Sequence, residues 1–254
     1  MTQTAPAVEP TARPRMRGDG WRTAARGIGQ LLITAGVVIL LFVVYELWFT
    51  GFYTEAQQHK LTQQIENSWR HGGLDISQVK IGHVPLGSGI AILRIPRFGR
   101  HYHMVIVEGT NYNDLQKGPG HYPGTALPGQ VGNFSVAGHR TTYLHPFYDI
   151  NELKPGDKIV LETKAMWFTY TVENIPAAKG YPRIPYQEIV DPTDVKVAYA
   201  VPDQNDPNKV PRLRMLTFTS CNPRYSAAQR IVVHALLTEA LHKGPGVVPP
   251  ALVS

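Results

Sequence analysis

The sequence contains one cysteine, Cys221, among 254 residues. A single cysteine cannot form an internal disulfide. If the folded part of the chain lies outside the cell, Cys221 is therefore a buried inert side chain, an intermolecular link or a reactive thiol.

Two kinds of metal-binding pattern are missing as well. The acidic residues are scattered, whereas a calcium site needs several oxygen ligands close together. His101 and His103 flank Tyr102, but two histidines without a third ligand nearby are poor evidence for a metal site. We therefore expect no obligatory metal and no other cofactor.

Positive charge is concentrated near the beginning of the chain rather than spread along it. The formal net charge is +6, and five arginines precede the first apolar run: Arg13, Arg15, Arg17, Arg22 and Arg26. No stripe of lysine and arginine interleaved with aromatic residues follows. The sequence therefore does not predict a nucleic-acid partner.

An uncharged apolar stretch, GIGQLLITAGVVILLFVVY, covers residues 27–45. About 19 residues at a rise of 1.5 Å span nearly 30 Å, the thickness of the hydrocarbon core of a bilayer. Aromatic residues typical of a membrane interface lie at its end: Tyr45, Trp48, Phe49, Phe52 and Tyr53. A signal peptide would have a shorter apolar core and a cleavage site of small residues. We therefore predict a transmembrane helix.

The position of the arginines predicts the orientation of this helix. Positively charged flanks stay in the cytoplasm, so we expect a cytoplasmic N-terminus and an extracellular remainder. The chain then divides into a basic tail (1–26), a transmembrane helix (27–49), an extracellular stalk or linker (50–88), a globular domain (89–243) and a C-terminal tail (244–254). Within the stalk, Leu61, Ile65 and Trp69 are spaced by four and predict a short amphipathic helix.

The globular domain consists of short β-rich runs between turns that contain glycine and proline. The runs are residues 90–95, 103–108, 133–137, 158–163, 167–173, 195–201, 212–219 and 231–237. About eight short strands without a long helix predict an all-β fold, either a closed barrel or a sandwich. One helical turn is expected in each of the segments 111–117 and 146–153.

Cys221 ends one of these runs, Leu216-Thr217-Phe218-Thr219-Ser220-Cys221, and Arg230 begins the next one. If the two strands pair as neighbours, Arg230 lies beside the strand end that carries the thiol. A reactive thiolate needs a cationic or basic neighbour, and arginine can also stabilise an oxyanion that forms on a substrate carbonyl.

His139 is the candidate base, because histidine exchanges protons near neutral pH. It follows a β run that ends in Ala137-Gly138. Taken alone, a histidine after a glycine is more often an ordinary loop residue, and a free cysteine is more often a small buried hydrophobe. The conjunction of both residues with Arg230 indicates a catalytic site.

Several motifs occur in an order that resembles the sortases. They are the strand end AGHRTT (137–142), the turn LKPGD (153–157), the strand end TFTSC (217–221) and a following arginine. The resemblance covers residues 90–237. The segments GPGHYPGT (118–125) and LTFTSCNPRY (216–225) are most similar to class E, or housekeeping, sortases of actinobacteria.

This resemblance implies a sortase-type eight-stranded β-barrel with short helical turns, preceded by one transmembrane helix. It implies a membrane-anchored cysteine transpeptidase that cleaves a Leu-Pro-x-Thr-Gly sorting signal, or the Leu-Ala-x-Thr-Gly variant of class E, between Thr and Gly. A thioester on the cysteine then passes the threonine to an amine of a lipid-linked peptidoglycan precursor. The implied partners are this precursor, surface proteins that carry the signal, and the membrane.

The resemblance also assigns roles to residues. Cys221 matches the nucleophile, His139 the general acid and base, and Arg230 the arginine that orients the substrate and stabilises the oxyanion. Tyr122, Thr219 and Ser220 are the expected contacts with the sorting signal. Ser220 stands where the family commonly has threonine, so the missing methyl group is expected to loosen a substrate contact. Phe218 is expected to face the core.

Three alternatives stay open at this point. Arg224 competes with Arg230, which we prefer because it begins a strand, whereas Arg224 sits in the turn. The same groups with water as acceptor would make a membrane-anchored cysteine peptidase. A protein of another class, a non-catalytic surface receptor on a β-barrel, is the third alternative.

Overall fold

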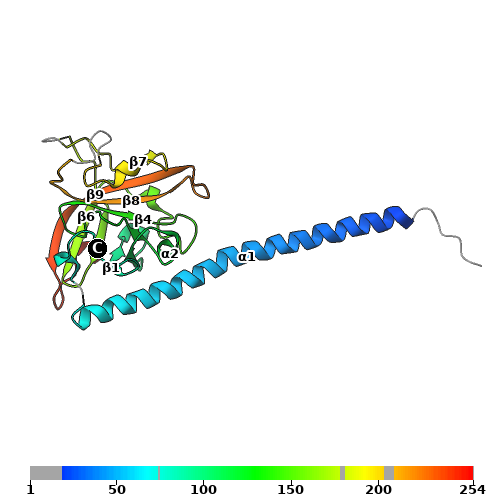
Figure 1. The fold of residues 1–254 in the computed structure, drawn as a ribbon, viewed down its shortest axis with the longest axis horizontal. Helices are drawn as coiled ribbons and strands as arrows, with labels where there is room; N and C mark the ends of the chain where they lie inside the picture. Colours follow the sequence, from blue (N-terminus) through cyan, green and yellow to red (C-terminus); the bar gives the residue numbers. More distant parts are fainter. Residues whose placement is uncertain (1–18, 74, 178–180, 203–208, 254) are drawn as a thin grey trace, which may run out of the picture. The chain divides into compact units, whose positions relative to one another are not determined.

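The computed structural model describes residues 19–73, 75–177, 181–202 and 209–253. Two compact units make up the chain, Met1–Glu46 and Leu47–Ser254. Helix α1 (Asp19–Arg70) contributes residues to both units (Figure 1). Most of the expected basic tail, residues 1–18, lies outside the described residues.

The described part of the first unit is an apolar helix. Its segment Gly20–Tyr45 contains 26 residues and reaches a mean hydropathy of 2.5. Its leucine, isoleucine and valine side chains are exposed rather than packed against protein. At about 1.5 Å per residue such a helix is longer than the hydrocarbon core of a bilayer. The prediction of an N-terminal helix that is able to cross a membrane is therefore confirmed.

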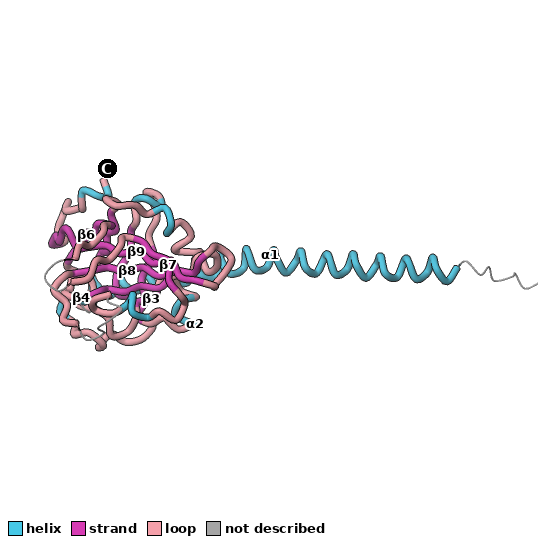
Figure 2. Tube along the Cα trace, turned by 90° about the horizontal axis from the view of Figure 1, so that it is seen from above, coloured by secondary structure: helices cyan, strands magenta, loops and turns pink. Residues whose placement is uncertain are grey.

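Eight of the strands in the described part of the second unit close into a β-barrel (Figures 1 and 2). Their order around the barrel is β6-β5-β1-β2-β3-β4-β8-β9, pairing of β9 with β6 closes it, and β7 pairs with the edge of β9. The predicted all-β fold with a sortase-type eight-stranded barrel is confirmed. The strand bounds are β1 Gly89–Arg94, β2 Met104–Glu108, β3 Gly120–His121, β4 Gly132–Ala137, β5 Lys158–Glu162, β6 Met166–Val172, β7 Gln187–Val190, β8 Arg214–Asn222 and β9 Gln229–His242.

The barrel interior is filled by aliphatic and aromatic side chains that alternate along the strands. Phe134, Phe147 and Phe218 are fully buried in the same core cluster, so the expectation that Phe218 faces the core is confirmed. Full burial of one such side chain contributes roughly 1.5–3 kcal/mol to folding. Burial of Phe218 in this core therefore stabilises β8, the strand that carries Cys221.

Short helices occur where single turns were expected, namely α2 (Tyr112–Leu115) and η3 (Ile150–Glu152). The prediction of a strand at 195–201 is wrong, because this segment begins with a 3-10 helix, η4 (Val195–Ala198). Asp194 precedes the helix and its side chain accepts a hydrogen bond from the Lys196 amide, which favours a turn over an extended chain. β3 and β7 were not anticipated, because two to four residues carry too little pattern.

The C-terminal part of α1 packs on the outer face of β1 and β2. Leu61 and Ile65 are buried against Ile92, Val105 and Val107. The spacing of apolar residues by four thus confirms the predicted amphipathic helix. The structure places residues 54–70 on the barrel rather than in a separate stalk, whereas the five-segment division of the chain stays a prediction.

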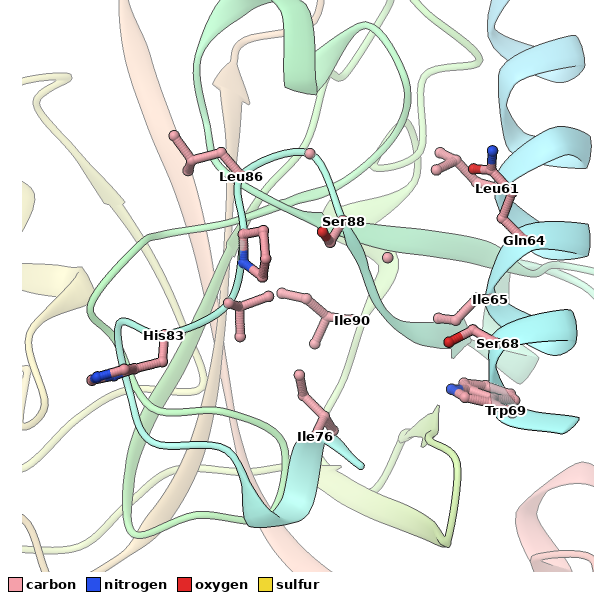
Figure 3. A pocket seen from close by; sticks show the side chains of 14 residues that line it. Leu61, Gln64, Ile65, Ser68, Trp69, Ile76, His83, Leu86, Ser88 and Ile90 are labelled. Carbon is pink, nitrogen blue, oxygen red and sulfur yellow. The ribbon is translucent and has the colours of Figure 1, made fainter. Parts of the chain in front are cut away.

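Hydrogen bonds fix the same part of the helix to the barrel. The Gln58 side-chain carbonyl accepts from the Val105 amide at 2.7 Å, and its amide donates to the Lys117 carbonyl at 2.6 Å. Beyond these contacts, a cavity of about 570 Å³ lies between the helix and the segment 83–90. Figure 3 shows Leu61, Ile65 and Trp69 on one side of it and Leu86 and Ile90 on the other.

Candidate active site

Cys221 lies near the end of β8 and is opposite Arg230 on β9. The two residues are Cα partners in the antiparallel β8–β9 pair. Directly opposite residues of such a pair have their side chains on the same face, with Cβ atoms about 4.5–5.5 Å apart. The predicted pairing of the two strands is therefore confirmed. Cys221 is half-buried and makes no disulfide.

Strand β4 brings His139 to the same end of the barrel. β4 runs parallel to β8, and the last pair in register joins Ala137 to Thr219. The Gly138 amide then donates to the Thr219 carbonyl at 3.1 Å, which extends the ladder by one residue. His139 and Cys221 each lie two residues beyond the Ala137–Thr219 pair, so the two residues are at the same level at this end of the barrel.

Packing requires the glycine that precedes the histidine. A Cβ atom on Gly138 would lie 2.5 Å from Cδ2 of the Phe147 ring. Phe147 is fully buried and contacts Phe218, with ring centroids 4.6 Å apart. The ring has no room to move aside, because protein cores are closely packed. The small residue thus allows the strand end just before His139 to approach the core.

The imidazole of His139 is half-buried, and the described residues offer it no carboxylate partner. Its Nε2 atom is buried and makes no hydrogen bond within them. Its ring lies beside the Tyr143 ring, with centroids 5.1 Å apart. Burial lowers the pKa of His139 below its ordinary value of 6.5, because the charged form loses hydration. The side chain is therefore neutral at neutral pH and able to accept a proton.

Tyr122 and Thr219 meet beside the cysteine. Their hydroxyl groups are hydrogen-bonded at 2.9 Å. Thr219 precedes Cys221 by two residues on β8, so both side chains are on the same face of the strand. The structure therefore brings together two of the residues expected to contact a sorting signal.

Ser220 is on the other face of β8. It is 3% exposed, and its hydroxyl donates to the Gly138 carbonyl at 2.8 Å. The bond connects the strand end that carries the cysteine to the strand end that carries the histidine. Contact of Ser220 with a sorting signal stays a prediction.

Comparison with known proteins identifies the family to which this barrel belongs. The family model described as Sortase domain matches residues 93–238. The chain belongs to the sortase family. Sortases are cysteine transpeptidases, and Cys221 is the one cysteine of this chain.

Two relatives from Streptomyces coelicolor are similar over most of this sortase. Sortase SrtE1 is 35% identical over 97% of this chain, which spans 66% of that protein. Sortase SrtE2 is 32% identical over 84% of this chain and 82% of that protein. These names confirm the predicted similarity to class E.

Solved structures of sortases share the fold. SrtF sortase from Corynebacterium diphtheriae is 34% identical with a TM-score of 0.62, covering 69% of this chain and 97% of that chain. Sortase E from Streptomyces avermitilis is 38% identical with a TM-score of 0.55, covering 66% of this chain and 99% of that chain.

The two arginines near the cysteine have different surroundings in this sortase. Arg230 donates through Nη1 to the carbonyls of Ala227 and Gln229, each at 3.0 Å. Arg224 donates to the Asp149 carboxylate at 3.0 Å and lies over the Tyr148 ring at 4.0 Å. Arg224 is therefore engaged by a neighbouring loop, whereas Arg230 keeps the position opposite the thiol. The choice of Arg230 stays a prediction, which this difference supports.

Two residues near the site were not singled out from the sequence. Arg140 is 5% exposed and donates to the Cys221 carbonyl at 3.2 Å. Tyr143 packs beside His139, and its hydroxyl is hydrogen-bonded to the Tyr112 hydroxyl at 2.9 Å. Arg140 could have been noticed because it directly follows His139. Tyr143 carries no such signal, because its contact with the imidazole depends on how the loop turns back.

Two buried histidines form polar clusters apart from Cys221. His121 is hydrogen-bonded to Glu108 at 2.6 Å, and His234 to Thr217 at 2.9 Å and Glu188 at 3.1 Å. Such bonds offset the cost of burying polar groups inside the barrel. In the described part of the chain, no group of three or more His, Cys, Asp and Glu side chains is arranged to hold a metal ion. The absence of a cofactor stays a prediction.

Proposed function

We propose that this sortase cleaves a Leu-Pro-x-Thr-Gly or Leu-Ala-x-Thr-Gly sorting signal between threonine and glycine, through a thioester on Cys221, and transfers the threonyl group to an amine of a lipid-linked peptidoglycan precursor. One observation carries the proposal. Cys221 is the register partner of Arg230, and His139 leaves the parallel strand at the same level as Cys221. Acyl transfer needs a nucleophile, a base and a cation, and the three strands bring these groups to the same end of the barrel.

In the first half of the reaction, neutral His139 accepts the thiol proton and the sulfur attacks the carbonyl carbon of the threonine. A bond forms between sulfur and carbon, and the carbonyl oxygen becomes an oxyanion. Arg230 stabilises this charge by donating hydrogen bonds. When the intermediate collapses, the carbon–nitrogen bond breaks and the imidazolium of His139 protonates the departing glycine amine. The product is a threonyl thioester on Cys221.

In the second half, the acceptor amine attacks the thioester. His139 takes the proton that the attacking nitrogen loses, the new amide bond forms, and the sulfur leaves and recovers its proton. The thioester keeps the acyl group activated between the two halves. Transfer to an amine exceeds hydrolysis only where water is poorly placed to attack.

The apolar helix supports a membrane location for this chemistry. The segment Gly20–Tyr45 is able to cross a membrane, and the arginines that precede it favour a cytoplasmic N-terminus. The catalytic domain is then extracellular, on the side where surface proteins and the precursor are presented. Anchoring to the same membrane raises the effective concentration of both substrates.

A related structure supports a peptide substrate. Sortase E1 from Streptomyces coelicolor, 34% identical to this chain, has been solved with a tripeptide in the active site. In the present chain the Tyr122 and Thr219 hydroxyls lie on the cysteine side of β8. We therefore expect them to contact the residues of the signal that precede the scissile bond.

Mass spectrometry of the intact full-length protein, in detergent with a small library of sorting peptides, tests the proposal. We expect Cys221 to gain the mass of the peptide up to its threonine, and we expect addition of a glycine-type amine to release an amide product. The Cys221→Ala variant is the control and should gain no mass.

Two other results would replace the proposed function. Release of the free threonyl acid, without amine adduct at any amine concentration, would identify a cysteine peptidase. If no peptide modified Cys221 and the Cys221→Ala variant displayed surface proteins as the wild type does, a non-catalytic receptor would be the better description.

A further inference from the structure

Arg140 is a buried cation whose hydrogen bonds all go to neutral acceptors. It is 5% exposed, and its four described hydrogen bonds end at the carbonyls of Tyr148 and Cys221 and the side-chain amides of Asn151 and Asn222. The nearby carboxylate, Asp149, is hydrogen-bonded to Arg224 instead. Burying a charge without a paired ion is costly, so the position calls for a reason beyond folding.

The electrostatic surroundings of Arg140 agree that its buried charge is costly. Burial, and next the neighbouring charge of Arg224, lower the pKa of Arg140 from its ordinary value. Interaction with the Asp149 carboxylate, and next with Cys221, acts in the opposite direction and favours the charged guanidinium.

The bonds of Arg140 complete a two-sided connection between the catalytic strand ends. On one side of His139, the Gly138 amide donates to the Thr219 carbonyl and the Gly138 carbonyl accepts from Ser220, at 3.1 and 2.8 Å. The other side of His139 is occupied by Arg140.

Nη1 of Arg140 donates to the Cys221 carbonyl at 3.2 Å and to the Asn222 side chain at 2.9 Å. The residues on both sides of the histidine are thus bonded to the residues around the cysteine. Cys221 and Asn222 pair with β9 on one side, whereas the pairing of β8 with β4 ends at Thr219, so the bonds of Arg140 hold the side of the strand that faces His139.

We propose that Arg140 is a positioning residue of the active site, which holds the backbone of Cys221 in place relative to His139 and presents to the sulfur a positive charge that solvent does not screen. The inference rests on the proposed acyl transfer. It assigns to Arg140 an effect on thioester formation rather than on peptide binding, because the side chain is only 5% exposed and its Nε, Nη1 and Nη2 atoms already donate to protein groups.

Arg224 provides a matched control. It is also an arginine that donates to the Tyr148 carbonyl and to the Asn151 side chain, at 3.3 Å each. The described residues give it no bond to Cys221 or Asn222. Replacing either arginine by methionine removes a cation that donates to Tyr148 and Asn151. Only the replacement of Arg140 also removes bonds to the cysteine end of β8.

The experiment makes three measurements on full-length protein in detergent. Rapid-quench mass spectrometry with a synthetic sorting peptide gives the rate of thioester formation. Iodoacetamide gives the rate of alkylation of Cys221, and thermal unfolding gives the stability. For Arg140→Met we expect the rate at saturating peptide to fall about 100-fold, the loss typical of a misplaced reacting group, with KM changed less than about threefold. Alkylation should also slow. Arg224→Met should keep the rate within about threefold of the wild type.

The Arg140→Lys variant separates position from charge. Lysine retains a cation but cannot reach four acceptors in the planar geometry of a guanidinium. We expect alkylation close to the wild-type rate and thioester formation reduced about tenfold or more. This variant decides the question if Arg140→Met does not fold.

The outcomes distinguish the inference from the proposed function. A wild-type protein that forms no thioester contradicts the proposed function. A wild-type protein that forms one, together with Arg140 variants that react as fast, overturns the inference. Equal losses in the Arg140 and Arg224 variants, in step with equal losses of thermal stability, would also overturn it, and so would a loss confined to KM.

Discussion

The hydroxyl groups of Tyr122 and Thr219 are hydrogen-bonded at 2.9 Å, although 97 residues separate them in the chain. Tyr122 follows β3, where its amide donates to the Ser135 carbonyl at 2.9 Å, and Thr219 lies on β8. The bond therefore connects two separate strands next to Cys221. It places an aromatic side chain beside the strand that carries the thiol, where we expect a sorting signal to bind.

The first prediction concerns this bond. Tyr122→Phe and Thr219→Val each remove one hydroxyl and keep the shape of the side chain. We expect each to raise KM for the sorting peptide with little effect on the rate at saturation. A double-mutant cycle on kcat/KM should give a coupling of about 0.5–1.5 kcal/mol, the net value of one hydrogen bond. Strictly additive effects would show that the bond does not contribute to recognition.

The second prediction separates the two arginines on either side of the turn. Arg230→Ala should lower kcat about 10²–10³-fold, because it removes a donor to the developing oxyanion. Arg224→Ala should lower it only slightly, because Arg224 is bonded to Asp149 and lies over the Tyr148 ring. Steady-state kinetics with one sorting peptide measures both variants. A larger loss in Arg224→Ala would assign the catalytic role to Arg224.

The third prediction concerns Ser220. Ser220→Ala removes the bond to the Gly138 carbonyl and should lower the free energy of unfolding by about 1–3 kcal/mol, because a buried acceptor loses its donor. Ser220→Thr keeps the hydroxyl and adds a methyl group. Denaturant unfolding measures stability and peptide kinetics measures KM. A lower KM in the Thr variant, at unchanged stability, would support a substrate contact; unchanged KM would limit Ser220 to connecting the two strand ends.

The fourth prediction follows from the lowered pKa of His139. The imidazole acts as a base only when it is neutral, so activity should fall as the pH drops through this pKa, and the acid limb of kcat/KM should lie below 6.5. The stability contributed by the buried neutral ring is fully present above 6.5 and is lost as the pH falls toward the lowered pKa. NMR titration of the His139 ring, with a His139→Gln variant for assignment, checks that its pKa lies below 6.5. An acid limb above 6.5 would contradict the prediction.

The fifth prediction tests whether the C-terminal part of α1 belongs to the folded domain. Ile65 is 5% exposed and packs against Val105 and Val107, so Ile65→Ala should cost about 2–5 kcal/mol of unfolding free energy. Gln63 is exposed on the same helix, and Gln63→Ala should change stability by less than about 0.5 kcal/mol. Equal effects of the two substitutions would show that residues 54–70 form a stalk that does not support the barrel.

Much of the site could be anticipated from local pattern because its residues lie at strand ends. The β-branched run before Cys221 and the small residues before His139 each indicate where a strand ends. The prediction of a strand at 195–201 was wrong for a local reason, because Asp194 caps a helical turn there. β3, with two residues, is too short for any periodicity, although it positions Tyr122.

The sequence by itself determined the apolar N-terminal helix, the all-β barrel and the order of the residues Cys221, His139 and Arg230 along the chain. The length of an apolar run, the alternation of apolar and polar residues and the presence of turn residues are local properties. They favour a helix, a strand or a turn wherever the segment lies in the fold. Only the tertiary structure decided that Ala137 pairs with Thr219, that Tyr122 meets Thr219 and that Arg140 lies buried against Cys221. These contacts depend on strand order and register, which arise when the whole core packs and which no local pattern specifies.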